Sequence, residues 1–181
     1  VLVFNDGVDP STGTDLGCRT GSLDGLKTFD DFYAAYLRQL AHIIGSVITC
    51  ANDFEQYLGT ISPAQVFSAT VEHSLKVARD AFQDGSIYKF SGILNVGFAT
   101  AVDALMAVKK FVYERQEVTL AQLRDILRDN WKGYEKLRLR ILHDGDKFGN
   151  GVDAVDLYAE ALARFIGNSI NLRPTARGGI Y

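Results

Sequence analysis

The sequence has little of several residue types, and each shortage excludes a class of protein. Two cysteines among 181 residues, Cys18 and Cys50, are too few for a disulfide framework or a zinc site. The apolar stretch of residues 39–52, which has no Lys, Arg, Asp or Glu, is too short to cross a bilayer. Basic residues are not in excess either, because 19 Lys and Arg face 22 Asp and Glu and the net charge is −3. We therefore expect a reduced, cytoplasmic protein with no nucleic-acid or membrane partner.

The overall composition is that of a folded domain. Hydrophobic residues make up 47% and charged residues 23% of the chain, which argues against disorder. No internal repeat or low-complexity linker marks a domain boundary. The apolar run of residues 1–4 has no preceding Met, and residues 177–181 look like the start of a strand. We expect both ends to have been cut from a longer chain.

Apolar periodicity predicts a helix-rich structure. Apolar residues recur at helical spacing from about Asp30 to Leu58, and the stripe is wide enough to predict that this helix is the most buried element. Thr119 and Gln122 have the spacing of a capping box at the start of another helix. Further helices are expected near residues 63–82, 98–113, 134–142 and 152–166, with a short extended piece at residues 87–90 and irregular structure over residues 5–27.

The residues that most often carry chemistry are isolated in this sequence. His42, His73 and His143 fall on different predicted elements, and none has a second His or Cys at a metal-ligand spacing. Cys18 lies in a Gly-rich loop with no neighbouring His to activate a thiol, and Cys50 is interpreted as a small core residue. From the residues alone, the chain is a helix-rich domain without a recognisable catalytic or metal constellation.

Several stretches, taken in order, resemble the glycyl radical enzyme superfamily. Asn5–Gly13 is similar to the "LNDG.dp.tG" stretch that follows the family's cysteine loop. Leu94–Tyr113 and Asn130–Arg138 resemble its "DsL.AIKK.V" and "N(F/W).GyE.lR" segments. Lys147–Asn150 is similar to "KYGN", and Arg177–Tyr181 to the "RGG.y" that leads into the next barrel strand. Each motif alone is weak, whereas their order and spacing together are specific.

The resemblance implies an α/β fold. In this family a ten-stranded barrel is wrapped by helices, and residues 1–181 would form a single, mostly helical segment of a pyruvate formate-lyase-like domain. The segment would lack the cysteine loop, which lies upstream, and the glycyl radical domain, which lies downstream. Neither Cys18 nor Cys50 has the sequence context of the family's cysteine loop, so no catalytic residue is expected here.

The resemblance also implies the chemistry of the whole enzyme. A glycyl radical oxidises a cysteine, and the thiyl radical abstracts a hydrogen from a small organic substrate to begin cleavage of a C–C or C–heteroatom bond. A partner activating enzyme that uses S-adenosylmethionine and a [4Fe-4S] cluster installs the radical, and the enzyme is a homodimer. This segment alone would bind no cofactor or metal and would be inactive.

Within the segment, the resemblance and the predicted elements single out two sets of residues. Tyr88, Phe90 and Tyr181 lie at passages from helix to strand and are candidates for the substrate pocket. The other set is interpreted as structural: Asp103, Lys109, Lys110, Gly149, Asn150, Arg177, Gly178 and Gly179.

Three functional interpretations stay open from the sequence. The opening Asn-Asp-Gly pattern looks closer to the dehydratase and decarboxylase-like members of the family. Pyruvate formate-lyase proper is a second enzyme interpretation, and it requires two adjacent cysteines upstream. The third interpretation is a non-catalytic helical scaffold derived from this fold.

The turn from Asp144 to Gly151 is predicted to bind no calcium. It resembles an EF-hand loop at its first, third and sixth positions, but Phe148 and Val155 occupy the fifth and twelfth, so the bidentate carboxylate is missing. Calorimetric titration with calcium to about millimolar concentration, where weak calcium loops respond, is expected to give no binding heat. Stoichiometric binding would contradict this interpretation.

Overall fold

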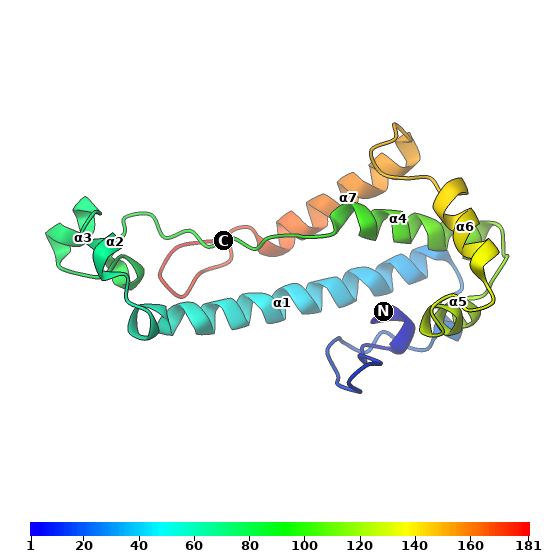
Figure 1. The fold of residues 1–181 in the computed structure, drawn as a ribbon, viewed down its shortest axis with the longest axis horizontal. Helices are drawn as coiled ribbons and strands as arrows, with labels where there is room; N and C mark the ends of the chain where they lie inside the picture. The colour runs from blue at the N-terminus through cyan, green and yellow to red at the C-terminus, as the bar shows by residue number, and fades with distance from the viewer. The chain divides into compact units, whose positions relative to one another are not determined.

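The computed structural model describes the backbone of residues 1–181 and every side chain except that of Asp144. Helices form nearly all of its regular structure (Figure 1). The α-helices are α1 (Phe29–Ile61), α2 (Gln65–Ser68), α3 (Glu72–Val77), α4 (Phe98–Val108), α5 (Leu120–Arg128), α6 (Glu135–Asp144) and α7 (Asp153–Ile170). Two short 3-10 helices, η1 (Val3–Asn5) and η2 (Leu23–Gly25), and two π-type turns, η3 (Ala81–Gly85) and η4 (Lys109–Glu114), complete the set.

The expected α/β class is wrong for this chain, which is helical. The described residues contain no strand, only isolated bridges between Val8 and Asp15 and between Pro174 and Ile180. Residues 87–91 and 177–181 run without helix. The sequence predicts an extended piece at residues 87–90 and the start of a strand at residues 177–181. A strand, however, needs a neighbour along its length to satisfy its backbone groups, and these two segments share a single backbone hydrogen bond, from Ser91 N–H to the Ile180 carbonyl.

The chain divides into two compact units. One contains residues 1–43 and 95–165, and the other contains residues 44–94 and 166–181. Helices α1 and α7 each contribute residues to both units. The expectation that the chain is one segment of a larger domain is a different statement and stays a prediction.

The first unit has its apolar core where α4, η4, α5 and α6 contribute side chains. Phe111, Ile126 and Leu137 form a buried cluster, and half-buried neighbours such as Trp131 pack against it. The predicted capping box at the start of α5 is confirmed, since Thr119 and Gln122 bond reciprocally to each other's backbone N–H groups. This cap fixes the start of the helix that delivers Ile126 to the core.

The prediction that the long helix is the most buried element is wrong for this chain. Helix α1 buries only part of its apolar surface: Phe32 and Ile48 are each 4% exposed, whereas Phe54 is 58% exposed and Ile61 is 70% exposed. Cys50 is exposed as well and is not a core residue. A wide apolar stripe predicts how much apolar surface a helix has, but it does not say which part of that surface other residues of the chain cover.

Truncation of Phe111 is expected to destabilise the protein strongly. Phe111 is 1% exposed and is central to the cluster with Ile126 and Leu137, so Phe111→Ala is expected to lower the free energy of unfolding by about 3–5 kcal/mol. Urea unfolding followed by circular dichroism measures this. Leu157→Ala is the matched control, because Leu157 is 67% exposed in the same unit. Equal losses for the two variants would contradict the assigned core.

Candidate functional site

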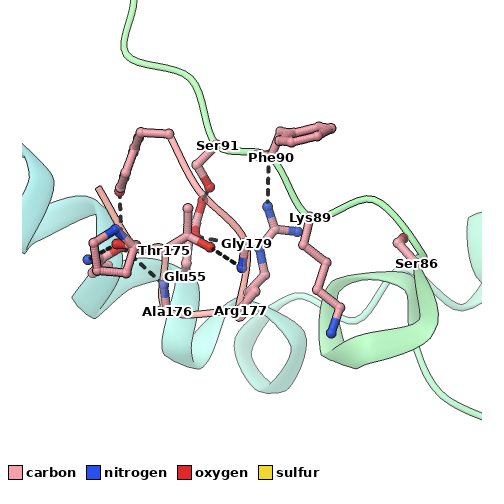
Figure 2. A network of polar contacts seen from close by, with 12 residues as sticks. Glu55, Ser86, Lys89, Phe90, Ser91, Thr175, Ala176, Arg177 and Gly179 are labelled. Atoms are coloured by element: carbon pink, nitrogen blue, oxygen red, sulfur yellow. Dashed lines mark hydrogen bonds and ion pairs between the residues drawn. The ribbon is translucent and has the colours of Figure 1, made fainter. Parts of the chain in front are cut away.

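Two segments far apart in sequence cross in the second unit, and the crossing contains most of the predicted site residues there. Residues 89–91 run against residues 177–180; we call this contact the crossing. Figure 2 shows it beside helix α1. Ser91 N–H donates to the Ile180 carbonyl at 3.3 Å, and Thr175 N–H donates to the Gly179 carbonyl at 3.0 Å within the turn that leads there.

The two glycines of the Arg-Gly-Gly motif serve the crossing in different ways. A Cβ on Gly179 would lie 1.8 Å from the Lys89 carbonyl oxygen, so only glycine fits where the backbones meet. Gly178 has open space around it but a φ of +78°, a left-handed conformation that other residues adopt at a cost. The motif therefore fits the close approach of two backbones, and its structural role in the whole enzyme stays a prediction.

A buried ion pair joins the crossing to helix α1. The Glu55 Oε2 and Arg177 Nε atoms are 3.5 Å apart, and the two side chains are only 14% and 18% exposed. The other carboxylate oxygen of Glu55 accepts a hydrogen bond from the Ser91 hydroxyl. A second nitrogen of the Arg177 guanidinium donates to the Phe90 carbonyl at 3.4 Å (Figure 2). Both charged groups thus hold the same short piece of chain, residues 90 and 91.

Asn52 makes a second attachment three residues earlier on α1. Its Oδ1 accepts hydrogen bonds from the Tyr181 hydroxyl at 3.0 Å and from Ala176 N–H at 3.1 Å. Its Nδ2 donates to the Pro174 carbonyl at 3.2 Å. Residues three apart lie on the same face of a helix, so Asn52 and Glu55 form one polar strip directed at the C-terminal loop.

Tyr181 is held in its protonated form. Burial raises the pKa of its hydroxyl, and the Glu55 carboxylate raises it further, while Arg177 has a smaller opposing effect. A neutral phenol can donate a hydrogen bond, and here it donates to Asn52. The side chain is half-buried, so one part of the ring rests against the protein and the remainder is accessible.

Tyr88 and Phe90 are displayed together on the surface of the same unit. Their rings stack with centroids 6.3 Å apart and planes inclined by 12°, and they are 78% and 68% exposed. Lys89, between them, turns the other way and binds Asp84 at 2.5 Å. That hydrogen bond is the main reason why the pKa of Asp84 is lowered. Both rings are thus largely exposed in this unit, and their role as pocket residues stays a prediction.

The remaining motif residues form a polar tie in the first unit. The Asp103 carboxylate accepts from Phe148 N–H at 2.9 Å, and the Lys110 ammonium lies 3.2 Å from Asp146. Lys109 pairs with Glu114 at 3.0 Å and also lies over the Tyr158 ring. The contacts of Asp103 and Lys110 join α4 and η4 to the turn after α6, whereas those of Lys109 stay on η4 and α7. The structural interpretation of these three residues stays a prediction.

The glycines of the turn from Asp144 to Gly151 serve the backbone in two different ways. Gly149 and Gly151 have φ values of +84° and +70°, as expected for glycines in a tight turn. Gly145 has a φ of −75°, and Asn150 is not among the residues with positive φ. Gly145 instead matters for space, since a Cβ there would lie 2.7 Å from the Ile141 carbonyl oxygen. The side chain of Asp144 lies outside the described residues.

The two cysteines lie in ordinary structural surroundings. Cys18 is half-buried, and its backbone N–H and carbonyl both bond to the amide of Gln39 on α1, at 3.1 and 2.7 Å. Within the described side chains, no three of His, Cys, Asp and Glu come together as metal ligands would. None of the helices in the described part of the chain has both the length and the apolar character that a bilayer crossing requires.

Sequence reasoning missed Asn52, Glu55 and Ser91. The available signal was the polar group Asn52, Asp53 and Glu55 within an otherwise apolar helical stripe. Their partners lie 36 to 129 residues away, so local periodicity does not identify them.

Comparison with known proteins gives the family of the chain. A family model described as "Pyruvate formate lyase-like" matches residues 1–181. The chain therefore belongs to the pyruvate formate lyase-like family. (2S)-3-sulfopropanediol dehydratase of Klebsiella oxytoca is 28% identical over 181 residues, which cover 99% of this chain and 22% of that protein.

Solved structures agree with this family. Hydroxyproline dehydratase from Clostridioides difficile, with substrate trans-4-hydroxy-L-proline bound, is similar at a TM-score of 0.88 and 26% identity, over 99% of this chain and 23% of that one. A glycyl radical enzyme from Archaeoglobus fulgidus is similar at a TM-score of 0.83 and 27% identity, over 99% and 22% of the two chains. The chain thus spans less than a quarter of the length of these relatives. The resemblance to glycyl radical enzymes that the sequence motifs indicate is confirmed.

Replacement of Gly179 by alanine is expected to open the crossing. The added methyl group would overlap the Lys89 carbonyl, and overpacking of this kind costs about 1–3 kcal/mol. Gly92→Ala is the matched control in the same unit, because a Cβ added there would have no atom within 4 Å and its φ is not positive. Hydrogen exchange measured by mass spectrometry is expected to rise in peptides spanning residues 89–91 and 175–181 for Gly179→Ala alone. Unchanged exchange in that variant would contradict the close backbone contact.

Proposed function

We propose that these 181 residues are a structural segment of a glycyl radical enzyme of the dehydratase and lyase type. The observation that carries this proposal is the match of 99% of the chain to dehydratases in both sequence and structure, with 26–28% identity and a TM-score of 0.88. The Asn-Asp-Gly pattern at residues 5–7 adds support from the sequence. The full-length protein would cleave a C–C or C–heteroatom bond of a small organic substrate.

The chemistry requires groups that these residues do not supply. When installed, a glycyl radical supplies hydrogen abstraction through a cysteine, and this begins bond cleavage. In this chain, Gly178 and Gly179 serve the crossing, and the backbone of Cys18 is bonded to Gln39. Cys50 is exposed on α1. We infer that the radical glycine and the catalytic cysteine belong to other parts of the full-length protein and that this segment alone is inactive.

The residues of the chain act as a support for the pocket. The apolar helices exclude water from the region where a reactive intermediate would be handled. Asn52 and the crossing hold the Tyr181 phenol in a fixed position with its proton retained. Tyr181 is accordingly the residue of this chain that we place at the substrate pocket. Tyr88 and Phe90, stacked on the same segment as the crossing, are retained as further candidates.

The proposed partners follow from the same assignment. An activating enzyme that carries S-adenosylmethionine and a [4Fe-4S] cluster would install the radical. In this proposal the cluster belongs to the activating enzyme. We also propose a homodimer in the cytoplasm.

The proposal predicts an oxygen-sensitive organic radical in the full-length protein. The protein is expressed anaerobically with its activating enzyme and S-adenosylmethionine, and electron paramagnetic resonance is recorded. A doublet from a backbone glycyl radical, lost in air, is the expected result. Turnover is then measured with compounds named for relatives: trans-4-hydroxy-L-proline, (2S)-3-sulfopropanediol, isethionate and glycerol.

Three outcomes would contradict parts of this proposal. Absence of the doublet, with an activating enzyme proven on another substrate protein, would favour a non-catalytic scaffold. A doublet from the 181-residue chain alone would overturn the placement of the radical outside it. Formation of formate and acetyl-CoA from pyruvate and CoA would indicate pyruvate formate-lyase proper in place of a dehydratase.

A further inference from the structure

We propose that Glu55 is a positioning residue for the reaction: its carboxylate locks residues 90–91 to residues 177–180 and thereby fixes Tyr181. This inference rests on the proposed function, because it assigns Glu55 a task in the pocket of that enzyme. Glu55 itself is covered by both segments, with 14% of its side chain exposed, so it acts through them and not by touching a substrate.

The two oxygens of the Glu55 carboxylate serve two different segments. One accepts the Ser91 hydroxyl, and the other lies 3.5 Å from Arg177 Nε. Arg177 in turn donates to the Phe90 carbonyl. The four groups form a closed circuit around two consecutive residues, so that neither segment slides along the other without breaking a charge-assisted contact (Figure 2).

Because the pair is buried, loss of either partner is expected to cost more free energy than loss of an exposed partner. Removal of one partner from a buried ion pair leaves the other charge without water and without a counter-ion, which is a larger penalty than loss of an exposed pair. Neither Glu55 Oε2 nor Arg177 Nε has a hydrogen bond in place of this attraction. The Glu72–Lys76 pair on α3 is the contrasting case, since its side chains are 82% and 67% exposed.

The circuit holds residues 177–180, and Tyr181 is the next residue in the chain. The carbonyl of Ile180 accepts Ser91 N–H, and the next residue, Tyr181, places its hydroxyl on Asn52. Asn52 and Glu55 lie on the same face of α1, so the helix sets the spacing between the phenol and the ion pair. If the crossing shifts, the Tyr181 side chain loses the position in which it meets a substrate.

The test compares Glu55→Gln with Glu72→Gln in the full-length protein, activated anaerobically as above. Glutamine still accepts the Ser91 hydroxyl but no longer attracts Arg177. For whichever of the four named compounds is turned over, KM is expected to rise about tenfold in Glu55→Gln, the scale of one charged hydrogen bond. The kcat per glycyl radical is expected to change less than about threefold, because the pocket loses binding that ground state and transition state share. Glu72→Gln is expected to match the wild type.

A second measurement, hydrogen exchange, does not depend on the activity of the enzyme. Hydrogen exchange of peptides spanning residues 86–94 and 175–181 is expected to rise in Glu55→Gln and to stay at the wild-type level in Glu72→Gln. Unchanged exchange in both segments would overturn the lock. Raised exchange with unchanged KM would overturn the positioning role and leave a structural one. If the wild type forms no radical, the proposed function fails, the positioning role falls with it, and exchange still decides whether Glu55 locks the crossing.

A double variant tests whether Glu55 and Arg177 act as one unit or independently. If Glu55 and Arg177 act as one unit, Glu55→Gln combined with Arg177→Gln is expected to raise KM no more than about twofold beyond the larger single effect. Fully multiplied effects would show that the two residues act independently and would overturn the circuit. Arg177→Lys keeps the charge but not the two-sided contact, so it is expected to restore only part of the wild-type KM.

Discussion

The Glu55–Arg177 ion pair is the contact on which the arrangement of the second unit depends. Both side chains are largely withdrawn from water, so each charge needs the other to remain in place. Their remaining contacts go to residues 90 and 91, and this draws together two segments that lie far apart in the sequence. The close approach at Gly179, the turn at Gly178 and the hydrogen bond from Ser91 to Ile180 are all geometric consequences of that crossing.

Helix α1 supplies the rigid part of this arrangement. Side chains on a helix hold their relative positions more accurately than side chains on loops. Asn52 and Glu55 therefore act as two fixed points to which the C-terminal loop is attached. The backbone of Tyr181 is held separately, since its N–H donates to the Arg173 carbonyl at 2.9 Å, and Asn52 adds the contact that fixes its hydroxyl. The same device is used in the first unit, where Asp103 on α4 holds the backbone of Phe148.

Local sequence rules predicted the parts of the structure that are decided locally. Thr119 and Gln122 cap a helix because a side chain reaches a backbone group three residues away, and that contact does not depend on the rest of the fold. The order of the short motifs likewise indicated the family without any tertiary information. Burial of α1 and Cys50 was predicted wrongly, because apolar spacing does not reveal which surface the remainder of the chain covers. The strand prediction failed for a related reason: residues 87–91 and 177–181 run without helix, but a strand is a property of a pair of segments and not of one.

The polar groups of the crossing find their partners within one unit of this chain, whereas part of the apolar surface of the chain stays exposed. Large apolar side chains remain exposed, among them Val66 on α2 at 85%, and Leu94 and Val96 between η3 and α4 at 86% and 81%. The polar contacts of the crossing, by contrast, begin and end on residues of one compact unit.

Asn52 and Glu55 were missed because a polar residue in an amphipathic helix is ordinarily on the solvent side, and only the folded chain shows that a loop lies there. Burial of apolar surface stabilises a fold but is non-directional. The ion pair and its hydrogen bonds, in contrast, specify which backbone groups meet. The position of Tyr181 is therefore encoded within this chain, because the groups that fix it are present among its own residues.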